Sequence, residues 1–206
     1  LWDSWFPKQE LERKKKFYLD SGQPSKFWQE YMMQVQSEDD SIWTRRHIKE
    51  YEGTFLHEPE QGISFLTLDD GIVLPVNVFA GVDPATDSQR RDADFSVIMV
   101  VAVDEDNNLY VLDYIKKRGI PVLGITGEST KGIVDYIFEM NNIYHPSLFT
   151  IEDTSMSKPV MQALMSEMRR INNFGVNFKA EKPGTRMSKR DRIQGVLSAR
   201  FSTGQI

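Results

Sequence analysis

The sequence predicts a mixed α/β fold in which helices flank a sheet, with an irregular N-terminal extension before it. Three observations predict this class. From residue 76 onward, short apolar runs alternate with stretches of helical period. Two of the apolar runs are joined by a polar turn of hairpin length. Before residue 76, glycines and prolines interrupt the pattern and no strand stands out.

The N-terminal 75 residues are expected to form an irregular connecting region that packs on its neighbours. Lys8–Leu19 has the composition of a charged helix, and aromatic residues at helical spacing predict a short helix over Ser25–Met33. His47–Leu74 is mixed and punctuated by glycine and proline, so we expect no regular element there. The sequence therefore predicts two regions, 1–75 and 76–206.

The second region is expected to begin with a strand and a hairpin. Val76–Asp83 is an apolar run that ends at an Asp-Pro pair, where a strand stops. Phe95–Val103 is almost entirely apolar, which is typical of a central strand buried on both faces. Asp104–Asn108 is a polar turn, and Leu109–Ile115 returns as the second strand of the hairpin.

Helices and strands alternate over the remainder of the chain. Apolar residues at i, i+4 and i+7 predict a helix over Ser129–Asn142, and Leu148–Ile151 reads as a second core strand. The next helix is expected to begin with Ser157 as its cap. Gly175–Phe178 is a short strand, and Lys189–Phe201 is an amphipathic helix with a basic outer face.

Composition excludes several kinds of protein. The chain has 206 residues, 40% of them hydrophobic, which is enough to build a core. No window holds 18 consecutive apolar residues, so no transmembrane helix is expected. The chain has no cysteine and only three well-separated histidines, which excludes disulfides, thiolate metal sites and a cysteine nucleophile. Catalysis, if present, must therefore use carboxylates.

The charge is unevenly distributed along the chain. Residues 158–206 hold ten Lys/Arg against three acids, a net charge of +7, whereas the whole chain carries −5 and residues 1–157 therefore carry −12. An acidic body with a basic end is typical of proteins that bind polyanions and use carboxylates for chemistry. A solvated basic helix is the alternative interpretation of the same pattern.

Two acids directly follow apolar strands. Asp83 ends the first strand and Glu152 ends the strand Leu148–Ile151, so both are expected at the rim of the sheet, where loops build sites. A turn or capping role is the alternative for either residue. Carboxylate oxygens suit Mg²⁺ or Mn²⁺, and two such cations can activate a water and stabilise the leaving oxygen of a phosphodiester. Both acids are thus candidate ligands.

The sequence around these acids resembles a known superfamily. Val82–Ala85 (Val-Asp-Pro-Ala), followed by Asp94–Ser96 at the start of a hydrophobic strand, resembles the first motif of RNase H-like nucleases. Thr150–Ser155 (Thr-Ile-Glu-Asp-Thr-Ser), followed by a helix, resembles the second motif. The resemblance implies an RNase H-like sheet flanked by helices.

Further segments of the sequence resemble one branch of that superfamily. Residues 182–193 and 201–206 are similar to the tail of the C-terminal nuclease domain of the terminase large subunit of tailed phages and herpesviruses. Residues 6–7 and 27–31 resemble the stretch that joins its packaging ATPase domain to the nuclease. The resemblance implies a metal-dependent endonuclease that cleaves concatemeric double-stranded viral DNA during genome packaging, in the cytoplasm of the host cell.

The resemblance also assigns site residues and partners. Asp83 matches the first metal-binding and catalytic acid and Glu152 the second, with Asp153 as its substitute. Asp94 is expected near the site, either as a further metal ligand or as a residue that orders the loop. The resemblance implies Mg²⁺ or Mn²⁺ as the cofactor, with two ions in the site. The family's third acid would lie beyond Ile206, which puts the activity of these 206 residues in question. Expected partners are DNA, the terminase small subunit, the portal and the packaging ATPase domain, with no membrane.

The basic segment Lys182–Arg192 is expected to contact DNA. It is punctuated by Pro-Gly and lacks large apolar residues at its start, which is typical of an exposed loop that enters a helix. Its candidate phosphate-contacting residues are Lys182, Arg186, Lys189, Arg190 and Arg192.

Two other functions fit parts of the pattern. A Holliday-junction resolvase shares the Asp-Pro and Ile-Glu motifs, although resolvases of this fold begin almost directly with the first strand and lack an extension of 75 residues. A non-catalytic RNase H-like module that binds DNA or a protein partner also fits, because the third acid is not found within the 206 residues.

Overall fold

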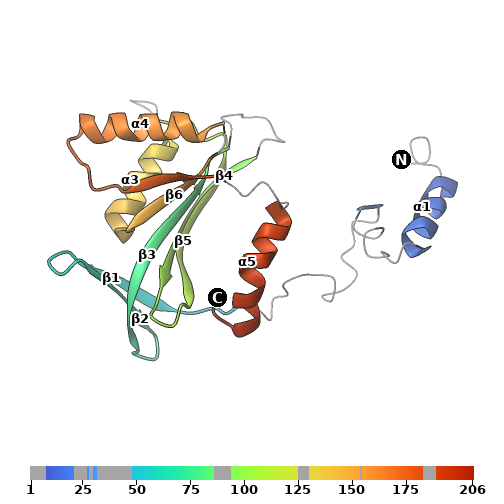
Figure 1. Ribbon diagram of the computed structural model, residues 1–206, viewed down its shortest axis with the longest axis horizontal. Helices are drawn as coiled ribbons and strands as arrows, with labels where there is room; N and C mark the ends of the chain where they lie inside the picture. The colour runs from blue at the N-terminus through green and yellow to red at the C-terminus, as the bar shows by residue number, and fades with distance from the viewer. Residues whose placement is uncertain are drawn as a thin grey trace. The chain divides into compact units, whose positions relative to one another are not determined.

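The computed structural model describes residues 8–20, 27, 30–31, 48–85, 94–124, 130–153, 155–182 and 189–206. The chain divides into two compact units, residues 1–48 and residues 49–206. The described helices and strands are labelled along the chain in Figure 1.

The first unit contains helix α1, Lys8–Asp20, which confirms the helix expected over Lys8–Leu19. Aromatic side chains pack beside it: the rings of Tyr18 and Tyr31 lie 6.2 Å apart, and the ring of Phe27 stacks on that of Tyr31 at 5.5 Å. The Tyr18 hydroxyl donates to a Glu30 carboxylate oxygen at 2.8 Å. Most of the helix expected over Ser25–Met33 lies outside the described residues.

The second unit is built on a sheet of seven strands. The first five follow one another in order and pair antiparallel, and the last two are parallel to the third. The strands are β1 Gly53–Glu58, β2 Ile63–Leu68, β3 Val73–Asp83, β4 Phe95–Val103, β5 Leu109–Arg118, β6 Leu148–Glu152 and β7 Phe178–Glu181. The sheet is therefore mixed, as the sequence predicts.

Strands β1 and β2 correct the sequence analysis, which expected an irregular region up to residue 75. Both strands pair antiparallel, β1 with β2 and β2 with β3, and belong to the second unit. The punctuating glycines mark tight turns rather than irregular chain, because Gly62 (φ +66°) and Gly71 (φ +83°) occupy the left-handed conformation between consecutive strands. The boundary between the two compact units along the chain therefore falls after residue 48, not after residue 75.

Strand β3 is the long central strand on which the sheet is organised. One of its edges pairs with β4 over residues 77–83. Its other edge is shared: residues 73–76 pair with β2, and residues 79–82 pair in parallel with β6. The acidic C-terminal end of β3 is consequently flanked by β4 on one side and β6 on the other.

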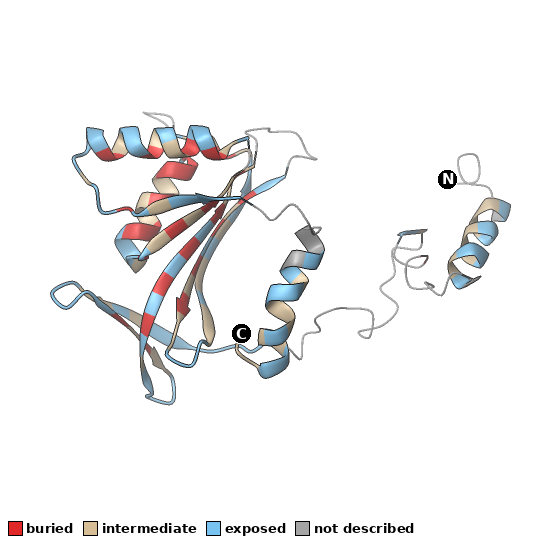
Figure 2. Cartoon of the chain, in the orientation of Figure 1, coloured by how far each residue is buried: buried red, intermediate tan, exposed pale blue. Residues whose placement is uncertain are grey.

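Two helices cover one face of the sheet. They are α3, Ile133–Tyr144, and α4, Ser157–Arg170, which connect β5 to β6 and β6 to β7. Figure 2 shows buried residues at alternating positions along the strands and on the helix sides that meet them. The core includes Val82 of β3, Ile98 of β4, Phe149 of β6 and Ile137 of α3.

The other side of the sheet is more open than the sequence suggested. We expected β4 to be buried on both faces, but Phe95 and Met99 are 37% and 38% exposed, whereas the alternating Ile98 and Val100 are buried. We call this surface the open face; it is formed by the strand residues that alternate with the core ones. On it lie Phe79, Asp83, Phe95, Met99 and Lys116.

Helix α5, Lys189–Thr203, follows β7. Its end is fixed to the β4–β5 turn, where the Arg200 guanidinium donates to the Asn107 carbonyl at 2.6 Å and the Gln205 carbonyl accepts the Leu109 N–H at 2.7 Å. Figure 1 shows α5 beside this turn and away from α3 and α4. Among the described helices, none is long and apolar enough to cross a membrane.

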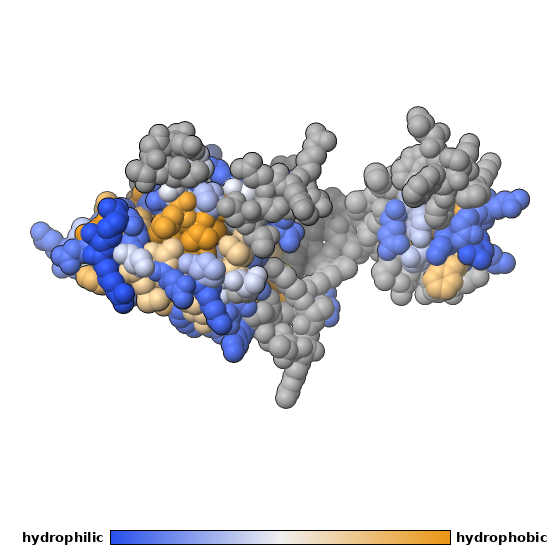
Figure 3. All heavy atoms as spheres, turned by 90° about the horizontal axis from the view of Figure 1, so that it is seen from above, coloured by the Kyte–Doolittle hydropathy of each residue, from blue (hydrophilic) through white to orange (hydrophobic). Residues whose placement is uncertain are grey.

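The outside of the helical layer is largely polar. Seen from above in Figure 3, hydrophilic side chains surround a smaller patch of hydrophobic ones on the second unit. Lys158 and Arg169 of α4 are among the exposed polar residues. Most of the remaining expected elements are confirmed; β7 begins at Phe178, the residue at which we expected that strand to end.

Candidate active site at the edge of the sheet

Asp83 and Glu152 lie on neighbouring strands at the same edge of the sheet. Val82 of β3 pairs with Ile151 of β6 in the parallel register, and the two acids follow directly in the chain. Neighbouring strands are about 4.8 Å apart. Val82 and Ile151 are buried under the helices, so the residues after them belong to the open face. Both acids are half-buried. The topology therefore brings together the two acids that the sequence singles out.

The chain leaves β3 in a defined way after Asp83. Pro84 follows and cannot donate to a strand ladder. The next N–H, that of Ala85, donates to the hydroxyl of Ser96 at 3.0 Å. Ser96 is itself buried on β4. This hydrogen bond ties the exit of β3 to the start of β4 and limits how far the backbone of Asp83 can move.

Asp153 has a different environment from Glu152. Its carboxylate accepts a hydrogen bond from the hydroxyl of Ser157 at 3.0 Å, and its N–H donates to the Glu181 carbonyl at 2.9 Å. Ser157 is fully buried and is the first residue of α4, after a cap at Met156. Ser157 is therefore not the helix cap expected from the sequence. Its bond to Asp153 joins β6 to α4.

Sequence reasoning missed a third acid at this edge. Glu181 of β7 pairs in register with Glu152 of β6, so Asp83, Glu152 and Glu181 end three adjacent strands. Glu181 is exposed, and its carboxylate lies 3.0 Å from the ammonium of Lys179. The signal in the sequence was the short strand that Glu181 ends. We predicted that strand over Gly175–Phe178, three residues before its position in the structure.

The donor set suits a hard divalent cation. Mg²⁺ usually keeps several waters and binds through one or two carboxylates together with substrate phosphates. Asp83 and Glu152 can supply two such carboxylates from fixed strand ends. Within the described ranges, no group of three or more acidic or histidine side chains is close enough to hold a metal by itself. The residues present therefore fit a cation that also takes water and phosphate ligands.

The other predicted site residues have varied positions. Asp94 is exposed and directly precedes β4. Lys182 is exposed after β7. Arg186 lies outside the described residues, as do the side chains of Lys189, Arg190 and Arg192, although the backbone of these last three belongs to α5. The expected DNA contact of this segment therefore stays a prediction.

A basic cluster on the open face was also missed. Lys116 and Arg118 of β5 are exposed and lie over the ring of Phe95, with the Lys116 nitrogen 4.6 Å and the Arg118 guanidinium carbon 4.1 Å from its centroid. Lys116 pairs with Val97 of β4, and Val97 pairs with Asp83. The signal in the sequence was the run of three basic residues that ends β5.

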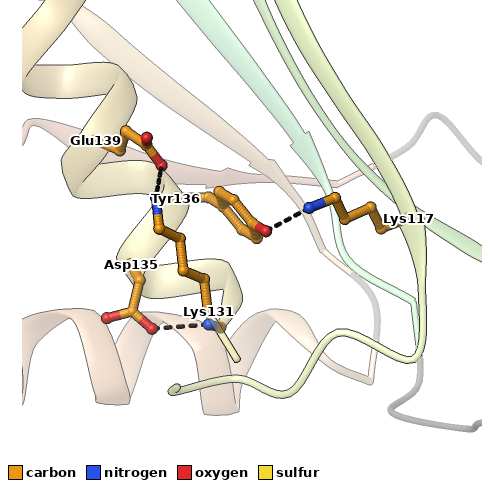
Figure 4. Close-up of polar contacts among 6 residues, drawn as sticks. Lys117, Lys131, Asp135, Tyr136 and Glu139 are labelled. Atoms are coloured by element: carbon orange, nitrogen blue, oxygen red, sulfur yellow. Dashed lines mark hydrogen bonds and ion pairs between the residues drawn. The ribbon is translucent and has the colours of Figure 1, made fainter. Parts of the chain in front are cut away.

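A shallow pocket lies on the opposite, helix-covered side of β5. Its volume is about 410 Å³, and Lys117, Lys131, Tyr136 and Glu139 are among its lining residues. Figure 4 shows Lys117 donating to the Tyr136 hydroxyl at 2.6 Å and Lys131 paired with Glu139 at 2.8 Å. Its lysines are thus engaged by neighbours within the pocket.

Comparison with known proteins adds no assignment. The chain matches no protein-family model, and no curated protein matches it significantly. The candidate site consequently rests on the geometry of the residues themselves.

Proposed function

We propose that this chain is a metal-dependent endonuclease that hydrolyses phosphodiester bonds of double-stranded DNA. The observation that carries the proposal is the position of Asp83 and Glu152, which end adjacent parallel strands on the same face of the sheet. Two carboxylates held side by side by backbone register form a geometry that favours binding of a divalent cation over separate surface roles.

Asp83 and Glu152 share one task in this proposal. Asp83, next to the turn that Ser96 anchors, and Glu152 would hold Mg²⁺ or Mn²⁺ at the edge of the sheet. When bound, the cation supplies an activated water and stabilises the charge on the leaving oxygen. Glu181 lies at the adjacent strand end and adds to the negative potential of this edge.

The finer identity is part of the same proposal. We propose an RNase H-like fold and place the protein with the nuclease domains of terminase large subunits, which act on concatemeric viral DNA. Support comes from the two acidic motifs, their order along the chain and the parallel pairing of β3 with β6. The proposed setting is the cytoplasm of a host cell, with the small subunit, the portal and a packaging ATPase domain as partners.

A plasmid assay tests the function. Supercoiled plasmid is incubated with the chain, and with a form extended beyond Ile206, in Mg²⁺, Mn²⁺ or EDTA. We expect nicking that requires the metal. Asp83→Asn should lower the rate more than about 100-fold, since loss of even an outer-shell partner of a metal costs 10–100-fold.

Asp106→Asn is the matched control, because Asp106 is an exposed acid in the turn at the far end of β4. It should cleave like the wild type. Cleavage of a four-way junction in preference to plasmid would instead favour a resolvase. Metal-dependent cleavage that Asp83→Asn leaves unchanged would remove Asp83 from the mechanism, and no cleavage by either form would favour a binding module.

A further inference from the structure

The cations of the second unit differ in how they are neutralised. Lys179 pairs with Glu181, Lys131 with Glu139 and Arg170 with Glu167. Lys116 and Arg118 differ from these: within the described part of the chain, no carboxylate forms an ion pair with either, and both contact the ring of Phe95 instead. Their charge is consequently available to an anion that approaches the open face.

Register places Lys116 in line with Asp83, and Arg118 two residues further along β5 on the same face. Asp83 of β3 pairs with Val97 of β4, and Val97 pairs with Lys116 of β5, so all three belong to the open face. Two strand spacings separate Asp83 from Lys116, a backbone distance of about 10 Å. Duplex DNA advances 3.4 Å per nucleotide along its axis, so about three nucleotides cover this distance.

Phe95 positions the side chains of Lys116 and Arg118. Its ring is 37% exposed, pairs in register with Arg118 and lies diagonal to Lys116 on the same face. A cation over an aromatic ring is attracted by the negative face of the ring, which restricts a long side chain that is otherwise mobile. Phe95 therefore acts as a positioning residue that holds both charged groups at the edge of the open face.

We propose that Lys116 and Arg118, held by Phe95, bind backbone phosphates of a DNA strand about three nucleotides from the phosphate that lies at Asp83 and Glu152. This inference rests on the proposed function, because it takes the acids as the place of cleavage. Lys116 and Arg118 supply an attractive contact that the acidic edge lacks, since carboxylates alone repel the polyanion. The contact reads no bases, because neither group is presented to a groove by a recognition helix.

The test is DNA binding measured without cleavage. A fluorescent 30-base-pair duplex is titrated with the full chain in EDTA at several salt concentrations, and affinity is read from anisotropy. Each phosphate contact contributes about 0.9 to the slope of log K against log salt. Lys116→Ala with Arg118→Ala should therefore lower the slope by about 1.8 on any sequence, and thermal unfolding should be unchanged because both side chains are exposed.

Lys158→Ala with Arg169→Ala is the matched control. It removes the same charge from exposed positions of α4, on the other side of the sheet, and should leave the slope near that of the wild type. Phe95→Leu keeps both charges and should preserve the slope while weakening binding about two- to fivefold, the effect of losing a weak exposed cation–π contact. Lys116→Gln with Arg118→Gln replaces the double alanine variant if that variant unfolds.

The outcomes separate this inference from the proposed function. A lower slope in the Lys116/Arg118 variant supports the contact even if the plasmid assay shows no cleavage. An unchanged slope in a folded variant, or an equal loss in the α4 control, overturns it even if the wild type cleaves DNA. A wild-type chain that does not bind the duplex overturns it as well.

Discussion

Glu152 and Asp153 are adjacent in the chain but have different surroundings. Successive strand residues point to opposite faces, so Glu152 shares the open face with Asp83 while the Asp153 carboxylate accepts the buried Ser157 hydroxyl. The structure therefore supports Glu152 as the second acid of the proposed site and gives Asp153 a role in joining β6 to α4.

A pair of isosteric variants tests this division. In the plasmid assay, Glu152→Gln should lower cleavage more than about 100-fold, whereas Asp153→Asn should retain most of it. In urea unfolding, Asp153→Asn should lose about 1 kcal/mol, because its amide oxygen can still accept the Ser157 hydroxyl but the bond is no longer strengthened by charge, and Glu152→Gln should lose little. The reverse pattern would make Asp153 the second acid.

His145 is a second residue whose environment predicts a measurable effect. Its ring stacks on that of His57 with centroids 4.1 Å apart, and His57 in turn contacts the Ser64 hydroxyl at 2.9 Å. Burial of part of the ring, followed by the nearby His57, lowers the pKa of His145 from its ordinary 6.5. The unfolded chain therefore takes up this proton at a higher pH than the folded one.

Stability should consequently fall as the pH is lowered from about 6.5 toward the depressed folded pKa of His145, and level off below it, because the unfolded state binds more protons in that window. Urea unfolding at pH 7.5, 6.5 and 5.5 measures this. His145→Asn should reduce the dependence, and Asn tolerates the left-handed φ of +47° at this position. If the stability of the His145→Asn variant depends on pH as strongly as that of the wild type, other groups cause the dependence.

At the scale of elements, the start of α3 is fixed by several hydrogen bonds. Gly132 precedes the helix, and the Asp135 carboxylate accepts the N–H groups of Gly132 at 2.7 Å and of Gly124 at 2.8 Å. The next two N–H groups, of Ile133 and Val134, donate to the carbonyls of residues 121 and 122. Residues 121, 122 and 124 are thus held against the start of α3, in part by N–H groups that the helix leaves without an intrahelical acceptor.

Gly132→Ala should destabilise the protein by about 1–3 kcal/mol, because an added Cβ would lie 2.4 Å from the carbonyl carbon of Leu123 and the backbone cannot yield cheaply. Gly195→Ala is the control. Gly195 lies inside α5 with open space around its Cβ position, so alanine should stabilise the helix by up to about 1 kcal/mol. Denaturant unfolding compares the two, and equal effects would contradict the close approach at Gly132.

At the scale of the whole molecule, the core belongs to one unit. Among the residues that the structure describes, its buried apolar cluster runs from Leu66 to Val176, all of them in the second unit. The beginning of the second unit is tied into that same unit, because the Lys49 ammonium donates to the Gly204 carbonyl and the Tyr51 hydroxyl donates to the Val111 carbonyl. Residues 49–206 therefore hold their own stabilising contacts.

A fragment of residues 49–206 should fold cooperatively, with the thermal midpoint of the full chain. Circular dichroism and calorimetry of the two proteins test this. A fragment that starts at residue 76 is the contrasting variant: it lacks β1, β2 and the buried Leu66, and should be markedly less stable. A midpoint that drops when only residues 1–48 are removed would show that the first unit stabilises the second.

The sequence by itself determined the elements whose pattern is local. The apolar run of β4, the polar hairpin turn and the helical spacing of α3, α4 and α5 depend on neighbours a few residues away, and each was predicted within a few residues. The same locality identified Asp83 and Glu152 as acids that end apolar strands. Prediction from local pattern failed for β1 and β2, because short strands between turn glycines carry too little pattern to be recognised singly.

Only the tertiary structure decided which residues become neighbours. Parallel pairing of β3 with β6 places Asp83 beside Glu152, 69 positions later in the chain, and extends that row to Glu181. The antiparallel register of β3, β4 and β5 adds Lys116 to the same face. Register depends on burying one face of every strand at once, a property of the assembled sheet that no single segment contains.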